Sequence, residues 1–249
     1  MAQLIKLNHY PSRYETNVYR YAGRFTQIKT RRYQEFAEKN AHRGLDVQTL
    51  KTKFHEAFFQ KQLLWATTTP SLEPPADEMK PTDPFIKQLL RLLDDTTLVL
   101  YHPTFLVDDT EIDGDLILLT PFTVWCIQTV FGESASVLQG VNTRKWQEIT
   151  SNGIKQLDNP YLALDPAVHA VERILTENDL DIPVKACLLA PESYVEFAKY
   201  SEAYDIYDRT TMKVWLSLMN RHRSPLKHGQ LRCAECLLVH TKTSAKARI

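Results

Sequence analysis

Apolar residues recur at spacings of three and four in the first third of the chain and again after a proline-rich segment. From Leu45 onward they predict an amphipathic helix of about five turns, with Asp46 as its N-cap. A shorter helix is predicted at residues 31–39, and PFIKQLLRLLDD predicts a further helix capped by Asp83. We therefore expect residues 1–66 to form a helical N-terminal region.

Four later segments are rich in β-branched and aliphatic residues, which favours strands. These segments are 97–107, 111–120, 122–130 and 182–190. Between the third and the fourth, ALDPAVHAVERILTEN predicts a helix with Asp165 as N-cap and Pro166 in its first turn. The order helix, three strands, helix, strand predicts an α/β fold in which helices flank a mixed sheet.

Proline content and charge divide the chain further. Residues 67–84 contain five prolines and predict an extended linker. Residues 1–66 hold 12 Lys and Arg against 5 Asp and Glu, residues 67–215 hold 11 against 24, and residues 216–249 hold 7 against 1. We expect a basic helical region at 1–66, the linker, an α/β domain at 85–215 containing a last helix near its end, and a basic tail at 216–249.

The composition, with 43% hydrophobic and 24% charged residues, is ordinary for a globular protein. No apolar run approaches the roughly 20 residues that cross a bilayer, and the first residues lack a signal-peptide core. We therefore expect a cytoplasmic protein outside the membrane. Seven glycines without a glycine-rich loop exclude a P-loop and a Rossmann fingerprint.

Arginines alternate with tyrosines in the basic N-terminal region. Cations can contact phosphates and aromatic rings can stack on bases, so this pattern predicts a nucleic-acid surface. Its arginines are Arg13, Arg20, Arg24, Arg31 and Arg32. The same charge is also consistent with docking of both basic ends on the acidic middle of the molecule, with a protein partner, or with a membrane surface.

The segment EIDGDLILLT contains a candidate acidic site. Side chains alternate across a strand, so we expect Glu111, Asp113 and Asp115 to project on one face. Three neighbouring carboxylates repel one another unless a cation or a basic residue lies among them. A turn at Thr120-Pro121 would bring the end of the next strand back beside these acids.

These residues resemble a known family. The run EIDGDLILLTPFTVWCIQTV, together with Trp146, the pair Asn159-Pro160 and the strand IPVKACLLAP, is similar to the nuclease-related domain NERD of the PD-(D/E)xK nuclease superfamily. The resemblance covers residues 84–197. It implies a restriction-endonuclease-like core and, in active members, cleavage by Mg²⁺ held on two carboxylates with a lysine nearby.

The resemblance also implies that the catalytic motif is degenerate here. Asp113 matches the family's metal-binding aspartate and Glu111 the acid before it. The next strand ends in Gln128, Thr129 and Val130, where the family has Glu-x-Lys, and the family's Gly-Glu in the preceding helix and its glutamine after Asn-Pro (here Ala163) are also missing. Glutamine binds Mg²⁺ weakly and valine carries no charge, so we expect no cofactor and no cleavage.

We therefore expect a catalytically inactive NERD-like protein that binds nucleic acid or a protein partner, in an oligomeric state that the sequence leaves open. One alternative is a weak or atypical Mg²⁺-dependent nuclease that recruits other acids, from among Asp108, Asp109, Asp115 and Glu133. A second alternative is a zinc-stabilised interaction module built on Cys233 and Cys236, with His228 and His240 nearby. The same cysteines fit a buried strand or helix equally well.

Overall fold

A computed structural model describes residues 1–75, 83–196, 204–221 and 224–248. The helices of this part are α1 (Arg13–Thr16), α2 (Val18–Asn40), α3 (Val47–Thr67), α4 (Pro84–Leu92), α5 (Tyr161–Glu177), α6 (Met212–Met219) and α7 (His228–Val239), with a 3-10 turn at Ala41–Arg43. The strands are β1 (Gln3–Leu7), β2 (Leu72–Glu73), β3 (Leu98–Tyr101), β4 (Thr104–Val107), β5 (Thr110–Asp113), β6 (Leu116–Leu119), β7 (Val124–Thr129), β8 (Val137–Gly140), β9 (Lys145–Thr150), β10 (Gly153–Asp158), β11 (Val184–Ala190), β12 (Tyr194–Glu196), β13 (Asp205–Asp208) and β14 (Lys246–Ala247). The predicted α/β class, with a mixed sheet and an N-terminal helical region, is confirmed.

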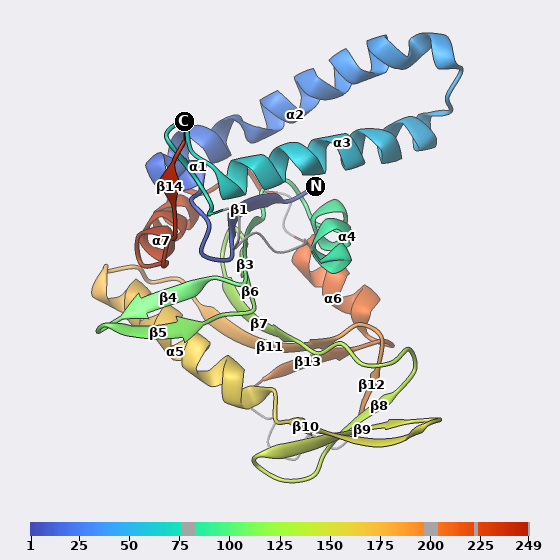
Figure 1. Ribbon diagram of the computed structural model, residues 1–249, viewed down its shortest axis with the longest axis vertical. Helices are drawn as coiled ribbons and strands as arrows, with labels where there is room; N and C mark the ends of the chain where they lie inside the picture. The colour runs from blue at the N-terminus through green and yellow to red at the C-terminus, as the bar shows by residue number, and fades with distance from the viewer. Residues whose placement is uncertain (76–82, 197–203, 222–223, 249) are drawn as a thin grey trace.

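The central sheet has the strand order β1-β3-β6-β7-β11-β13 (Figure 1). Neighbours among β3, β6 and β7 are antiparallel, whereas β1 runs parallel to β3, and β11 runs parallel to both β7 and β13. Successive residues of β3 alternate between two cores, with Leu98 and Leu100 in one and Val99 and Tyr101 in the other. Burial on both faces explains why the strands appear as continuous apolar runs.

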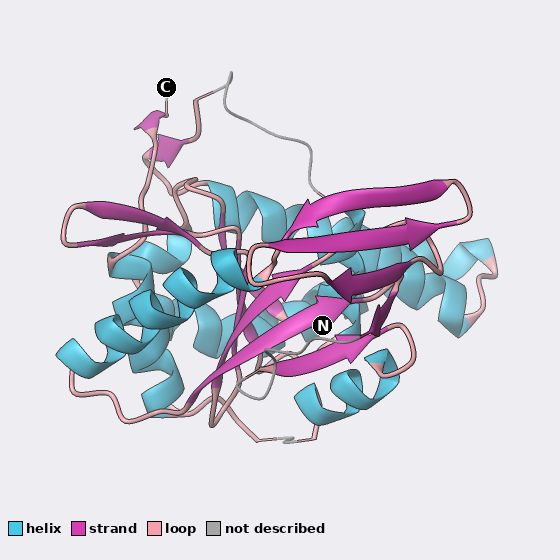
Figure 2. Cartoon of the chain, turned by 90° about the horizontal axis from the view of Figure 1, so that it is seen from below, coloured by secondary structure: helices cyan, strands magenta, loops and turns pink. Residues whose placement is uncertain are grey.

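Helices cover both faces of this sheet (Figures 1 and 2). The start of α2, with α1, α5 and α7, packs on one face, and α3, α4 and α6 pack on the other. Trp215 of α6 is fully buried in the second core, and Trp125 of β7 lies in the same core. The sheet therefore has apolar layers on either side, each closed by helices from distant parts of the chain.

The N-terminal region contributes directly to the sheet. Strand β1 is buried along its length and pairs with β3. Helices α2 and α3 then form a long hairpin that extends away from the sheet (Figure 1). Phe25, Phe54 and Phe58 form a small core within this hairpin. The helix predicted at residues 31–39 is the second half of α2, and Asp46 caps α3 as predicted.

Two of the predicted strands, 97–107 and 111–120, bend and divide between two sheets. His102 has a φ of 50° and is followed by Pro103, which has no N–H, so the chain leaves the central sheet after β3. Gly114 faces this bend, where a Cβ would lie 3.3 Å from the Pro103 Cγ. Strands β4 and β5 therefore form a separate hairpin beyond the bend.

The prediction for the start of α5 was wrong. The helix begins at Tyr161, so Pro166 lies inside it and Asp165 does not cap it. The amide oxygen of Asn159 accepts a hydrogen bond from the Tyr161 N–H and serves the first turn instead. Asn159 and Pro160 therefore lie immediately before the helix, and the Asn159 side chain accepts a hydrogen bond from its first residue.

The segment between the third and fourth predicted strands contains additional β structure. Strands β8, β9 and β10 form a sheet with β12 that projects from one end of the molecule (Figures 1 and 2). Residues 76–82, in the predicted linker 67–84, lie outside the described residues. Before them, β2 pairs with β14 near the C-terminus.

The predicted basic tail, 216–249, contains a helix that packs into the core. Helix α7 buries Cys233, Ala234 and Leu237. The fully buried Gln230 donates hydrogen bonds to the carbonyls of Thr96 and Leu119, which ties α7 to the sheet. Within the described residues, no helix combines the length and apolar character that crossing a membrane requires.

Candidate functional site

Asp115, immediately before β6, is the acid that lies beside Gln128 and Thr129 of β7. Leu116 pairs with Ile127, so the preceding Asp115 lies opposite Gln128. Its Oδ2 accepts hydrogen bonds from the Thr129 N–H, from the Thr129 hydroxyl at 2.6 Å and from the Gln128 amide at 3.2 Å. The side chain is 10% exposed, so this carboxylate joins β6 to β7 at a shielded position.

His102 and Tyr101 extend this cluster. His102 Nδ1 lies 3.2 Å from Asp115 Oδ1 and forms an ion pair with it when the imidazole is protonated. The Tyr101 hydroxyl donates to the Asp83 carboxylate at 3.1 Å, and burial, followed by the charge of Asp83, raises the pKa of Tyr101. The sequence analysis missed both residues, although the His102-Pro103 pair at the end of an apolar strand was a signal for a bend there.

The predicted row of three carboxylates is not formed. The bend at Gly114 separates Glu111 and Asp113 from Asp115. Asp113 Oδ1 accepts a hydrogen bond from the Thr104 hydroxyl at 2.7 Å, across the β4–β5 hairpin. Glu111 pairs with Lys242 at 2.7 Å. Alternation along one straight strand was the wrong assumption, because the strand is interrupted.

The residues around Asp115 do not fit a Mg²⁺ site for phosphodiester cleavage. Such a site needs a second carboxylate and a lysine, whereas the end of the neighbouring strand offers Gln128, Thr129 and Val130. Three donors already engage Asp115 Oδ2. In the described parts of the chain, no three His, Cys, Asp or Glu side chains form a group that could hold a metal ion. The chemistry of this cluster is that of a hydrogen-bonded strand junction.

The predicted nucleic-acid arginines divide into two environments. Arg20, Arg24 and Arg31 are exposed and occupy one stripe of α2, because residues four and seven apart return to nearly the same side of a helix. This stripe lies opposite the buried Val18, Ala22 and Phe25. Arg32 is also exposed, on the flank of the helix, and it pairs with Glu35 at 3.0 Å, as Arg31 does at 3.6 Å.

Arg13 lies elsewhere, in an aromatic enclosure. Its guanidinium carbon is 3.5 Å from the centre of the Trp65 ring and 4.6 Å from that of Tyr21. Burial lowers the pKa of this arginine, and the nearby Tyr14 and Tyr21 offset part of that effect. Arg13 therefore stabilises the packing of α1 against α2 and α3 and is withdrawn from any phosphate-binding surface.

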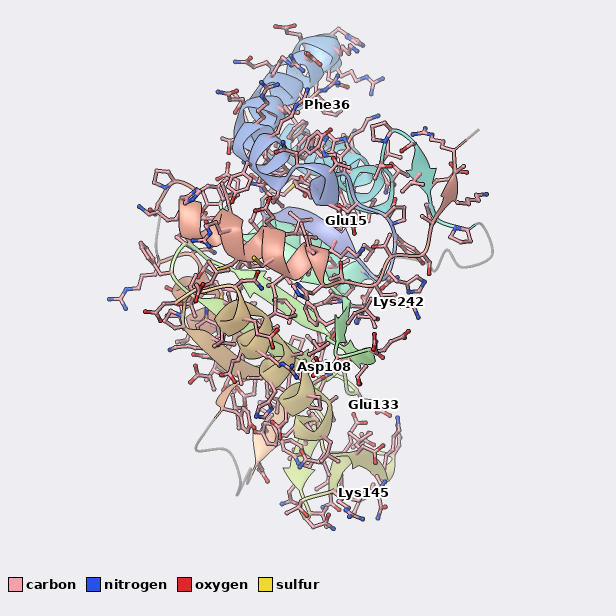
Figure 3. The ribbon with its side chains drawn as sticks, turned by 90° about the vertical axis from the view of Figure 1, so that its left-hand side faces the viewer. Glu15, Phe36, Asp108, Glu133, Lys145 and Lys242 are labelled. Atoms are coloured by element: carbon pink, nitrogen blue, oxygen red, sulfur yellow. The ribbon has the colours of Figure 1, made fainter. Side chains whose placement is uncertain are left out.

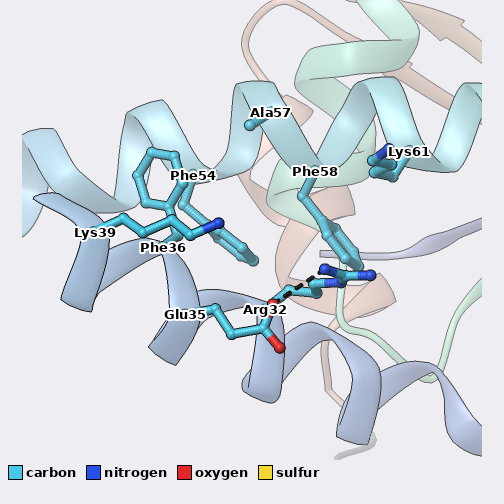
Figure 4. A pocket seen from close by; sticks show the side chains of 8 residues that line it. All are labelled: Arg32, Glu35, Phe36, Lys39, Phe54, Ala57, Phe58 and Lys61. Carbon is cyan, nitrogen blue, oxygen red and sulfur yellow. Dashed lines mark hydrogen bonds and ion pairs between the residues drawn. The ribbon is translucent and has the colours of Figure 1, made fainter.

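The hairpin carries a cleft between α2 and α3 (Figure 4). Its cavity volume is about 160 Å³. Phe36, Phe54 and Phe58 provide aromatic walls, and Phe54 and Phe58 are almost fully buried. Lys39 and Lys61 lie at its rim together with the Arg32–Glu35 pair. The cleft combines an apolar lining with a mainly cationic rim.

The basic ends also make ion pairs with acidic residues of the body. Lys242 pairs with Glu111, as noted above, and lies between Glu15 and Asp108 in Figure 3. Lys29 of α2 pairs with Asp95 at 2.7 Å. The exposed arginines of α2 make no ion pair with this acidic body among the described residues. Ion pairs with the acidic body therefore involve only part of the basic charge. Within the described residues, Arg20, Arg24 and Arg31 take no part in them.

The cysteines of the zinc alternative lie on α7. Cys233 is buried and Cys236 is half-buried, and burial raises the pKa of both thiols, that of Cys233 to about 11. His240 Nδ1 contacts the Cys236 carbonyl at 2.8 Å, and the ring of His228 lies beside that of Tyr19. Raised thiol pKa values oppose the thiolate form that binds zinc.

Comparisons of the chain with protein-family models, with curated proteins and with solved structures found no match.

Proposed function

We propose that this chain is a nuclease-related, NERD-like protein that retains a nuclease scaffold without its cleavage chemistry and binds nucleic acid along the solvent face of α2. The order α4, β3, β6, β7, α5, β11, which leaves out the strands outside the central sheet, supports the scaffold, because it contains the helix, three strands, helix and strand that the sequence predicts for the α/β core. The hydrogen-bonded state of Asp115, beside Gln128, supports the loss of cleavage.

The α2 stripe is the observation that carries the binding function. Arg20, Arg24 and Arg31 lie on one stretch of helix, and the eleven steps from the first to the last correspond to about 16 Å at about 1.5 Å per residue. The α2–α3 hairpin, residues 18–67, holds ten Lys and Arg against four Asp and Glu, a net charge of +6. A line of guanidinium groups on a projecting, positively charged hairpin can bind the phosphate groups of a nucleic-acid backbone. Such contacts would not depend on the base sequence.

The test is fluorescence anisotropy with labelled single- and double-stranded DNA and RNA across a series of salt concentrations. The variant carries Arg20→Glu, Arg24→Glu and Arg31→Glu. If each arginine contacts one phosphate of a duplex, the slope of log K against log salt loses about 0.9 per contact, or about 2.7 in total. Affinity at low salt falls by more than tenfold.

The control carries the same charge change on exposed residues away from α2, namely Arg144→Glu, Lys155→Glu and Lys213→Glu. It should keep most of the wild-type affinity and its salt slope. Equal losses in both variants would mean that only net charge matters, and no wild-type binding at low salt would refute the proposal.

A protein partner is the second candidate, and the cleft between α2 and α3 favours it. The aromatic walls around Phe36 and the rim cations Lys39 and Lys61 suit an apolar side chain flanked by acids. Substituting Phe36→Asp would abolish such binding and leave the α2 stripe unchanged. Retained nucleic-acid affinity in that variant would separate the two surfaces.

A further inference from the structure

A second cavity is lined by residues of α3 and α4. In Figure 1, α4 and α7 lie below opposite ends of the α2–α3 hairpin's base. The cavity volume is about 250 Å³. By this measure about 10 to 15 Å³ suffices for one water molecule, so the cavity has room for a polyatomic ion and the atoms attached to it. Its polar lining comes from the N-terminal residue Met1, from Thr52, His55 and Glu56 of α3 and from Lys87, Gln88 and Arg91 of α4. Burial lowers the pKa of the Met1 ammonium to about 6.

Positive charge exceeds negative charge at this cavity. Lys87 and Arg91 are four residues apart on α4, so they project on the same side of the helix, one turn apart. Lys87 pairs with Glu56 at 2.7 Å. Arg91 has no ion pair within the described residues, so its guanidinium is available to a ligand. Beyond the cavity, Asp95, whose charge acts on the Met1 ammonium together with that of Asp94, is paired with Lys29.

Positive charges near the cavity also act on His55, which lies on the α3 side of the cavity. Burial lowers its pKa, and neighbouring positive charges lower it further, first that of the Met1 N-terminal ammonium and then those of Arg91, Lys29 and Lys51. A neutral imidazole still offers one N–H donor. An anion placed between His55 and Arg91 would reverse the electrostatic effect and favour the protonated ring.

We propose that the cavity between α3 and α4 binds a phosphate group, held by Arg91 with hydrogen bonds from His55 and Gln88. A guanidinium can donate two parallel hydrogen bonds to a phosphate, and the uncharged donors add direction without further repulsion. The Lys87–Glu56 pair borders the cavity and limits its net charge, which favours a single phosphate group over a polyanion. This inference goes beyond the proposed function and does not depend on it.

The test follows the His55 ring resonances by NMR during titration with inorganic phosphate at constant ionic strength. Phosphate should shift these resonances and raise the pKa of His55, whereas potassium chloride at the same ionic strength should not. Arg91→Gln should weaken phosphate binding at least tenfold, and Arg144→Gln, on an exposed loop elsewhere, should leave it unchanged. An unchanged His55 in phosphate, or equal effects of both variants, would overturn the proposal.

The same assay distinguishes the source of the phosphate. Adenosine monophosphate and adenosine differ only by the phosphate group, and so do an oligonucleotide with and without a 5′-phosphate. If adenosine monophosphate binds and the two oligonucleotides bind equally, the natural ligand is a small phosphomonoester. An Arg91-dependent preference for the 5′-phosphorylated strand identifies a nucleic-acid end.

Failure of this proposal is distinguishable from failure of the proposed function. Arg91→Gln leaves the α2 stripe intact, and the triple α2 variant leaves the cavity lining intact. Loss of phosphate binding with retained oligonucleotide binding, or the reverse, assigns each effect to its own surface.

Discussion

The Asp115 carboxylate and the arginines on the outer face of α2 are both charged, but only the arginines are exposed to solvent. Asp115 is 10% exposed and is engaged by Thr129, Gln128 and His102. Arg20 and Arg24 stand on an exposed helix face without an ion pair among the described residues. The first region uses its charge to hold two strands together, and the second can offer its charge to a ligand. Burial and partners, more than residue type, separate structural from functional charge in this molecule.

The largest expected effect on stability is at the Asp115 junction. Replacing Asp115→Ala removes the acceptor for the Thr129 N–H and hydroxyl and for the Gln128 amide, leaving part-buried donors unpaired. We expect the free energy of unfolding to fall by about 3 kcal/mol. Urea denaturation measures the change.

Asp113→Ala is the matched control for this prediction. It removes one hydrogen bond, to Thr104, from an exposed hairpin, so the loss should stay near 0.5 kcal/mol, roughly the range of surface substitutions. Similar losses for the two aspartates would contradict the assignment of Asp115 as the structural acid.

A smaller effect is expected at Arg13. Arg13→Ala removes a cation from the faces of Trp65 and Tyr21, and a desolvated contact of this kind is worth about 2 kcal/mol. Thermal or urea unfolding should show this loss, while affinity for nucleic acid stays at the wild-type value. Arg24→Ala should behave in the opposite way, with stability within about 0.5 kcal/mol of wild type and weaker binding. A reversed pattern would place Arg13 on the binding surface.

The sequence predicted the order of the central elements well, because both faces of the sheet are buried and its strands are therefore uniformly apolar. It did not predict the bend that separates Asp113 from Asp115. That bend depends on the φ of His102 and on the close approach of Gly114 to Pro103, which are contacts between segments rather than local patterns.

The sequence also did not predict that Arg13 is enclosed by aromatic rings while Arg20 is exposed. Arg13 and Arg20 both lie next to tyrosines, and the same pairing suits a nucleic-acid surface or an internal cation–π contact. Trp65, 52 residues after Arg13, distinguishes the two, because its ring lies 3.5 Å from the Arg13 guanidinium carbon and covers that group together with Tyr21. For α7 the sequence left a buried strand or helix as one alternative within a predicted basic tail, whereas the structure forms a helix that buries Cys233, Ala234, Leu237 and Leu238.

The central claim is that the chain binds nucleic acid and leaves it intact. The most direct measurement incubates the purified protein with end-labelled DNA and RNA in Mg²⁺ or Mn²⁺, at concentrations where anisotropy shows a complex, and separates the strands on a denaturing gel. We expect full-length strands in the presence of the complex. Cleavage that Asp115→Ala or Asp113→Ala abolishes would contradict the account and establish a metal-dependent nuclease.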